Sequence, residues 1–306
     1  MKIKWTVINP KIIILTLFYL LPVLCLTGCS QEPQETRNSH EVQKAPEDPV
    51  KDVTTTQTQP FIASDWPQYL GPDRNAVSGE KGLLKSWPAE GPKVLWTVPL
   101  GEGFGGAAIS EGKVYVYDRV DKKTNVLRCL DLMTGKEEWT FSNEAPGSFS
   151  FDGSRSIPTI DGNKIYICDL VGNLNCVDKI THKSLWRKNI WTDFGGTDLP
   201  KWAIAQNPLI YQNMVIVASQ TEEAGIVAYD KENGNIIWKT PRLPGCTGFD
   251  AGYVSPAIMK ISGEDHLIMV TAASRDGSIK GAVLGYNPEN GNLLLYNVSL
   301  FRKTEG

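Results

Sequence analysis

The sequence predicts an all-β protein built from repeated four-stranded antiparallel sheets. Short runs such as KVYVYD, KIYICD, MVIVAS and HLIMVT are rich in β-branched and aromatic residues and are bounded by Gly, Asn and Asp. Long apolar stripes with helical spacing are absent from the chain. One phrase recurs as LDLMTGKEEW, VDKITHKSLW and AYDKENGNIIW, at a period of about 43 to 57 residues. Four strands per unit at that period predict a β-propeller of about four blades.

Residues 1–29 are predicted to be a lipoprotein signal peptide. Lysines at positions 2, 4 and 11 precede an apolar run, Ile12 to Leu26, that is shorter than a spanning helix requires. The run ends in LTGC, which resembles the bacterial lipobox, and Cys29 would then be the lipid acceptor. Ser30 in place of an aspartate resembles the pattern that allows passage to the outer membrane. The alternative is an ordinary secretory signal in which the cysteine is incidental.

Residues 30–61 are predicted to be a disordered tether rich in Pro, Glu and Thr. The segment has almost no apolar side chains, so it cannot offset the entropy of ordering. Residues 62–306 are then the propeller domain. Within that domain the predicted blades are approximately 105–141, 155–190, 206–241 and 254–299.

Each recurring phrase places a tryptophan on the outermost strand of a blade. In every copy an Asp begins a tight turn, and in two of the three copies a Gly in that turn allows positive φ. The tryptophan lies four residues after the position of this Gly. We expect Trp139, Trp186 and Trp238 to fill the space between adjacent blades, although an aromatic ligand platform is the alternative. His182 replaces the glycine in the second copy, so its turn is expected to be altered.

Trp96, in KVLW, belongs to the same series but has no blade of its own. It occupies a fourth-strand position, yet nothing before it supplies three preceding strands. We therefore expect four blades and one orphan N-terminal strand, an incomplete ring. The exposed edge of such a ring predicts self-association.

These motifs resemble the PQQ-like, tryptophan-docked β-propeller repeat family. The order WPQ…GP.R…GLL…WP…GP..LW between Asp65 and Trp96 is similar to a planctomycete-type lipoprotein subset, as are FGGTDLPKWAIAQNPLI and GYVSPAI. The family includes quinoprotein alcohol dehydrogenases and, more distantly, the lipoprotein of the outer-membrane barrel-assembly machinery. The resemblance implies the fold and leaves activity open, because this fold carries both enzymes and scaffolds.

If the chain were an enzyme of that family, the resemblance would imply a bound pyrroloquinoline quinone (PQQ) with calcium and an aspartate base. Many of these enzymes also have two adjacent cysteines. The sequence has no Cys-Cys pair and no matching set of calcium ligands. We therefore expect no catalytic residues, no metal and no cofactor, with PQQ and calcium implied only if the chain is an oxidoreductase. Cys168 and Cys176 flank the turn in CDLVGNLNC; they form either a disulfide or two buried thiols.

The loops that enter the innermost strands form the face where a ligand is expected. Their polar and aromatic residues suit a polar ligand or a peptide, whereas the alternative is simple packing over the central channel. The candidate ligand-face residues are Phe104, Arg155, Trp202, Asp250 and Tyr253.

The leading hypothesis is a lipid-anchored, non-catalytic binding or scaffold protein of the cell envelope, exported and facing the periplasm from the outer membrane. Its partners would be envelope proteins or a surface ligand. The net charge of −3 gives no basic footprint for nucleic acid. The alternatives are a PQQ-dependent oxidoreductase or its truncated remnant, and a polysaccharide-binding module.

Overall fold

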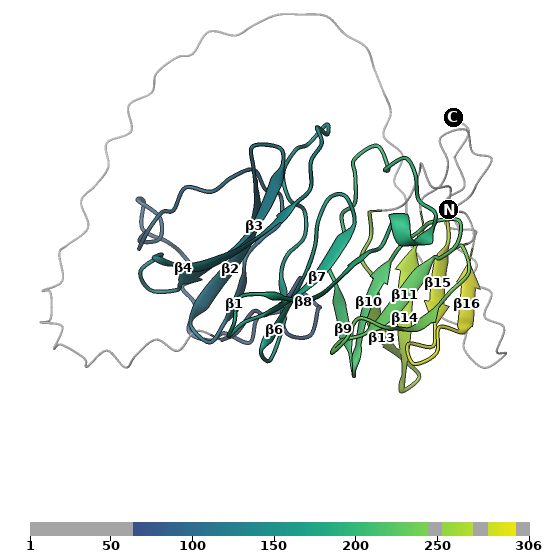
Figure 1. Cartoon of the computed structure of the whole chain (residues 1–306). Helices are drawn as coiled ribbons and strands as arrows, with labels where there is room; N and C mark the ends of the chain where they lie inside the picture. The colour runs from purple at the N-terminus through teal and green to yellow at the C-terminus, as the bar shows by residue number, and fades with distance from the viewer. Residues whose placement is uncertain (1–63, 244–252, 272–280, 298–306) are drawn as a thin grey trace, which may run out of the picture. The chain divides into compact units, whose positions relative to one another are not determined.

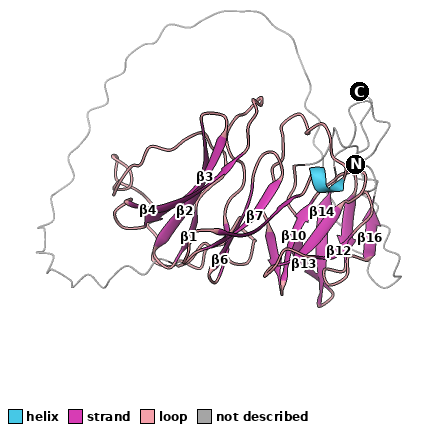
Figure 2. Ribbon diagram, in the orientation of Figure 1, coloured by secondary structure: helices cyan, strands magenta, loops and turns pink. Residues whose placement is uncertain are grey.

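The described part of the chain is all-β and forms four sheets, as predicted. The computed structural model describes residues 64–243, 253–271 and 281–297, which all lie in the second of two compact units, Ala63–Gly306. These residues form sixteen strands in four four-stranded sheets and one three-residue 3₁₀ helix (Figure 1). Figure 2 shows strand and loop almost throughout. The predicted signal peptide with Cys29, the tether and Asp250 lie outside the described residues.

Each sheet is an antiparallel meander whose strands pair in chain order. Blade 1 contains β1 (Ala108–Ser110), β2 (Lys113–Val120), β3 (Thr124–Asp131) and β4 (Glu137–Glu144). Blade 2 contains β5 (Thr159–Asp161), β6 (Lys164–Cys168), β7 (Asn173–Asp178) and β8 (Ser184–Asn189). Blade 3 contains β9 (Leu209–Tyr211), β10 (Met214–Ala218), β11 (Ile226–Asp230) and β12 (Ile236–Lys239). Blade 4 contains β13 (Ala257–Ile261), β14 (Glu264–Val270), β15 (Val283–Tyr286) and β16 (Leu293–Asn297).

The hydrophobic core lies between neighbouring blades, because a single sheet cannot bury both of its faces. One cluster joins blades 1 and 2, a second joins blades 2 and 3, and a third joins blades 3 and 4. The middle strand β10 is buried along its whole length, as its continuous apolar sequence MVIVA requires. Each fully buried Val or Leu side chain contributes about 1.5 to 3 kcal/mol, so these clusters hold the blades together.

The tryptophans of the outer strands lie against the turn of the next blade. The indole of Trp186 packs so closely on Gly234 that an added Cβ would lie 2.8 Å from it, and its Nε1 donates to the Lys231 carbonyl at 3.2 Å. Trp238 makes the same two contacts with Gly291 and the Pro288 carbonyl, the latter at 3.2 Å. In both turns the glycine has positive φ, and its N–H donates to the backbone carbonyl of the residue that begins the turn. A left-handed glycine therefore gives the indole a flat backbone surface.

The turn that contains His182 is not altered, contrary to expectation. His182 adopts a φ of 58°, and its N–H donates to the Asp178 carbonyl at 2.9 Å, as Gly135 does to Asp131 at 2.8 Å. The imidazole stacks on Trp139 with a centroid distance of 4.3 Å and an interplanar angle of 13°. Blade 2 therefore keeps the turn and replaces the glycine–indole contact by a ring stack.

The segment between Trp66 and Arg74 contacts the first strands of blades 1 and 2 and the entrances of blades 3 and 4, which the sequence did not reveal. Trp66 exchanges two backbone hydrogen bonds with Ile109, and the Pro67 carbonyl accepts one from Ile160. The Arg74 guanidinium then donates to three carbonyls at the entrances of blades 3 and 4. These acceptors are Pro208 at 3.1 Å, Asn207 at 3.4 Å and Pro256 at 3.3 Å.

Candidate functional site

Two aromatic groups on the loop face contain four of the five predicted ligand-face residues. Phe104 contacts Phe151 edge-to-face at 5.8 Å, and the Arg155 guanidinium lies 6.0 Å from the Phe104 ring centroid. Arg155 donates to the Phe151 carbonyl at 2.5 Å, and its burial lowers its pKa. This guanidinium is therefore engaged in holding its own loop.

The second group pairs Trp202 with Tyr253. Their rings are 5.3 Å apart, and the Tyr253 hydroxyl accepts a hydrogen bond from the Trp202 backbone N–H at 3.1 Å. Lys201 extends over the Trp202 ring at 5.8 Å, and Trp202 remains 43% exposed. These contacts join two distant loops, and the exposed indole leaves a surface that a ligand could cover.

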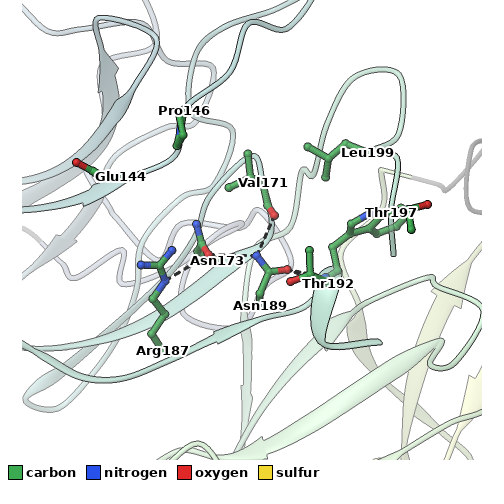
Figure 3. A pocket seen from close by; sticks show the side chains of 10 residues that line it. Glu144, Pro146, Val171, Asn173, Arg187, Asn189, Thr192, Thr197 and Leu199 are labelled. Atoms are coloured by element: carbon green, nitrogen blue, oxygen red, sulfur yellow. Dashed lines mark hydrogen bonds between the residues drawn. The ribbon is translucent and has the colours of Figure 1, made fainter. Parts of the chain in front are cut away.

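A cleft of about 330 Å³ on the same face was not anticipated from the sequence. It lies beside the outer strands of blades 1 and 2 and the loop that carries the 3₁₀ helix η1 (Thr192–Phe194). Figure 3 shows its polar wall, where Arg187, Asn173 and Asn189 are linked by hydrogen bonds. The lining residues are Glu144, Pro146, Val171, Asn173, Arg187, Asn189, Trp191, Thr192, Thr197 and Leu199.

A buried carboxylate orients this polar wall. Asp169 is 1% exposed and accepts four hydrogen bonds, from the backbone N–H groups of Val171 and Asn173 and from the amides of Asn173 and Asn143. Burial raises the pKa of Asp169, which these hydrogen bonds partly offset. Asn143 comes from β4 in blade 1, and its Oδ1 accepts from the Tyr117 hydroxyl at 2.7 Å. The network therefore joins blade 1 to the β6–β7 turn of blade 2.

Arg187 is the charged side chain that this network presents to the cleft. Its Nε donates to Asn173 Oδ1 at 3.2 Å, and Asn173 is itself fixed by Asp169 at 2.7 Å. Within the described part of the chain, the terminal nitrogens of Arg187 make no hydrogen bond. A guanidinium anchored through Nε and open at its two terminal nitrogens is suited to bidentate recognition of a carboxylate.

The Asp169 cluster does not fit a calcium ion, although it combines a carboxylate with two amides. Both amides turn their NH₂ groups toward Asp169 Oδ2, and their oxygens accept from Tyr117, Arg187 and Asn189. No oxygen pair is therefore left for a cation that takes six to eight oxygen ligands. Across the described ranges, no group of three or more His, Cys, Asp and Glu side chains could hold a metal.

Cys168 and Cys176 are free, buried thiols, which is the second of the two alternatives that the sequence left open. The β6–β7 turn is centred one residue earlier than a symmetric turn around Gly172 would be, because Asp169 pairs with Asn173. Cys168 consequently faces Leu174, and Cys176 faces Tyr166. Burial raises the pKa of Cys176 to about 12 and keeps the thiol protonated. The two sulfurs therefore contribute to the core between blades 2 and 3.

The cleft residues had one signal in the sequence. Asn173 and Asn175 interrupt an otherwise apolar buried strand, and β7 is buried at five of its six positions. Buried amides require partners, which indicates a polar network. Nothing in the local sequence showed that Arg187 or Glu144 would line the same cleft, because they come from different blades.

Comparison with known proteins establishes the family. A family model described as outer membrane protein assembly factor BamB matches residues 56–148 and 122–304. The chain belongs to this PQQ-like propeller repeat family. The resemblance inferred from the sequence motifs is therefore confirmed.

Curated relatives match over part of their length. Tetrathionate hydrolase from Acidithiobacillus ferrooxidans is 26% identical over 159 residues, 52% of this chain and 27% of that protein. Quinoprotein ethanol dehydrogenase from Pseudomonas aeruginosa is 28% identical over 152 residues, 46% of this chain and 23% of that protein. The chain thus spans about a quarter of the length of these relatives.

A solved structure supports the fold. The quinohemoprotein alcohol dehydrogenase from Comamonas testosteroni superposes with a TM-score of 0.54 at 16% identity, covering 76% of this chain and 41% of that chain. At this identity the likeness shows a shared propeller architecture, and activity is a separate question. No helix in the described residues is long and apolar enough to cross a bilayer.

Proposed function

We propose that this protein is a non-catalytic binding protein of the cell envelope, which holds a partner protein or a surface ligand on its loop face. The observation that carries the proposal is the cleft beside blades 1 and 2. There Arg187 is fixed through Nε and keeps its terminal nitrogens open. A side chain held in this way recognises a ligand at little entropic cost.

The envelope location is supported by the family and by the N-terminal sequence. The matching family is described by an outer-membrane assembly factor, and the LTGC motif resembles a lipobox. We infer that Cys29 carries the lipid anchor and that the domain faces the periplasm from the outer membrane. Mass spectrometry of the N-terminal peptide of the mature protein tests the anchor: an N-terminal Cys29 that carries lipid supports it, and an unmodified cysteine contradicts it.

The binding proposal is tested by comparing two charge-removing variants in blade 2. Arg187→Gln removes the cleft cation, whereas Lys183→Gln removes an exposed cation from the β7–β8 turn. Envelope partners crosslinked to the wild-type protein should be retained by Lys183→Gln and lost, at least ten-fold, by Arg187→Gln. Equal recovery with both variants contradicts the use of the cleft.

The second candidate function is a PQQ-dependent oxidoreductase, favoured by the quinoprotein dehydrogenases among the relatives. Among the described residues, no cluster of three or more His, Cys, Asp and Glu side chains is placed to hold a metal ion. Incubation with PQQ and calcium, followed by a dye-linked alcohol oxidation assay, decides between the two. Oxidation above the protein-free background would overturn the non-catalytic proposal.

A further inference from the structure

The cleft beside blades 1 and 2 contains two charged side chains of opposite sign. Arg187 extends from β8 in blade 2, and Glu144 is the last residue of β4 in blade 1. Both residues are exposed. Among the described residues, the Glu144 carboxylate has no hydrogen-bond or ion-pair partner, so it is not paired with Arg187. Each charge is therefore available to a ligand of complementary charge.

The amides of the blade 2 wall are used within the protein. The side-chain oxygen and nitrogen of both Asn173 and Asn189 make hydrogen bonds to neighbouring groups of the chain. Neither amide can turn toward a ligand without breaking these bonds, which costs free energy when the group is buried. Recognition of a charged ligand group on this wall therefore falls to Arg187.

A buried donor next to Arg187 also lacks a partner. Asn175 is opposite Arg187 in the β7–β8 ladder, and directly opposed residues of antiparallel strands share a face of the sheet. Asn175 is 1% exposed, and its Nδ2 makes no hydrogen bond within the described part of the chain. Donors therefore exceed acceptors on this wall, so the ligand group expected here is an acceptor. A carboxylate fits best, because it accepts two parallel hydrogen bonds from one guanidinium.

The other walls limit the rest of the ligand. Figure 3 shows Glu144 and Pro146 on one side of the cleft and Thr197 and Leu199 on the other. Because Glu144 repels a second negative group, the cleft is unsuited to a polyanion such as a polyphosphate. Trp191, the aromatic residue among those that line the cleft, is 2% exposed, so it presents no ring face for stacking on a sugar or a base.

A peptide carries the groups that complement these walls. The cleft volume of about 330 Å³ is at the lower end of the roughly 300 to 1,000 Å³ of ligand pockets, so it holds a few side chains rather than a folded surface. We propose that the cleft binds a short peptide segment with one acidic and one basic side chain, the carboxylate on the Arg187 guanidinium and the basic group beside Glu144. The proposal rests on the proposed function, since it specifies the ligand of the same cleft.

Selection from a displayed peptide library tests the proposal without a known partner sequence. The probe is a library of random heptapeptides, held between flexible linkers inside a phage coat protein so that neither end of the peptide is free. After selection on the full chain, we expect an acidic and a basic residue at a fixed spacing to be enriched about ten-fold or more over the unselected library. Absence of enrichment overturns the proposal, and so does enrichment of acidic residues without a basic one.

Single substitutions assign each charge of the selected peptides. Arg187→Gln should abolish the preference for the acidic residue, whereas Glu144→Gln should abolish the preference for the basic residue and retain the acidic one. Lys183→Gln is the matched control and should retain both. Selected peptides with blocked ends should bind Arg187→Gln about ten-fold more weakly than Lys183→Gln in fluorescence polarisation.

The conservative variant separates bidentate recognition from charge alone. Arg187→Lys keeps the positive charge and removes the planar fork, so it should lose most of the affinity that Arg187→Gln loses. Circular dichroism checks that every variant is folded. Peptides that bind Arg187→Gln as tightly as the wild-type protein overturn the proposal.

The outcomes also separate this ligand from the proposed function. If Arg187→Gln loses the crosslinked envelope partners but the wild-type protein selects no acid–base pair, the cleft is used and its ligand is not this kind of peptide. If neither the partners nor the peptides respond to Arg187→Gln, both the ligand and the use of the cleft are contradicted.

Discussion

Alanine at Gly135 should destabilise the protein more than alanine at Gly112, although the two glycines have the same backbone conformation. Their φ angles are 68° and 72°, and both lie in blade 1. A Cβ at position 112 would meet nothing within 4 Å, whereas a Cβ at position 135 would lie 2.6 Å from the Trp96 ring. The left-handed conformation costs either alanine about 1 to 2 kcal/mol. The difference between the two variants therefore isolates the docking of Trp96.

The additional loss of stability in Gly135→Ala comes from displacement of the Trp96 indole. Ordinary carbon contacts are about 3.5 to 4.0 Å, so the ring must retreat by about 1 Å. That movement lengthens the 2.9 Å hydrogen bond to the Leu132 carbonyl, whose net contribution is about 0.5 to 1.5 kcal/mol. With the lost packing, we expect Gly135→Ala to cost about 1 to 3 kcal/mol more than Gly112→Ala.

Urea unfolding monitored by tryptophan fluorescence measures both free energies, with the m-value as a check that the unfolded state is unchanged. Quenching by acrylamide in the native state should also increase in Gly135→Ala, because Trp96 moves toward solvent. Equal free energies of unfolding for the two variants, with unchanged quenching, would refute the docking of Trp96 on blade 1.

Three further predictions concern other parts of the fold. Arg74→Met should lower the free energy of unfolding by about 2 to 4 kcal/mol in urea, because the three hydrogen bonds from the guanidinium to the entrance carbonyls are lost. His182→Gly should change it by less than about 1 kcal/mol, since relief of the left-handed strain offsets the lost stack on Trp139. Because burial raises the pKa of Cys176 to about 12, the unfolded thiol ionises first and stability falls as pH rises above its ordinary pKa of about 8.5. Between pH 8 and 10, the wild-type protein should lose about 2 kcal/mol more than Cys176→Ala in urea titrations.

The sequence predicted the fold well because the relevant information is local. Strand runs such as MVIVA and turns such as DKENG are each specified within a few residues, and the turn of Asp230 closes through its own side chain onto Glu232 and Asn233. Because the pattern of one blade recurs along the sequence, four blades could be predicted without information on tertiary contacts. The propeller architecture then followed from the requirement that the sheets bury their faces against one another.

The errors arose where one residue changed a local geometry. At the β6–β7 turn, the three-residue loop is closed by the carboxylate of Asp169, and the register differs by two residues from the symmetric hairpin that a Cys168–Cys176 disulfide would have needed. At His182, the expectation of an altered turn underestimated the stabilisation that a ring stack offers to a left-handed residue. Both outcomes depend on side-chain contacts that a pattern of residue types does not contain.

The features that sequence could not provide are long-range. Arg74 reaches carbonyls more than 130 positions away, and the cleft combines residues from β4, β8 and the loop after β8. A motif such as WPQ…GP.R indicated relatedness without indicating that its arginine spans the entrances of two blades. The arrangement of the blades decides these contacts.

The docking contacts also explain how a tryptophan strand can sit beside a blade without a sheet of its own. Each indole needs only a left-handed turn and one carbonyl of the next blade, as Trp96 finds at Gly135 and Leu132. Such nearest-neighbour contacts form independently of ring closure, so stability accumulates from one blade to the next. Among the described residues, 92–100 make no backbone–backbone hydrogen bond, and the segment is still docked on blade 1 through the Trp96 side chain. Docking of an outer segment on the next blade and pairing of its backbone within a sheet are therefore separate interactions in this fold.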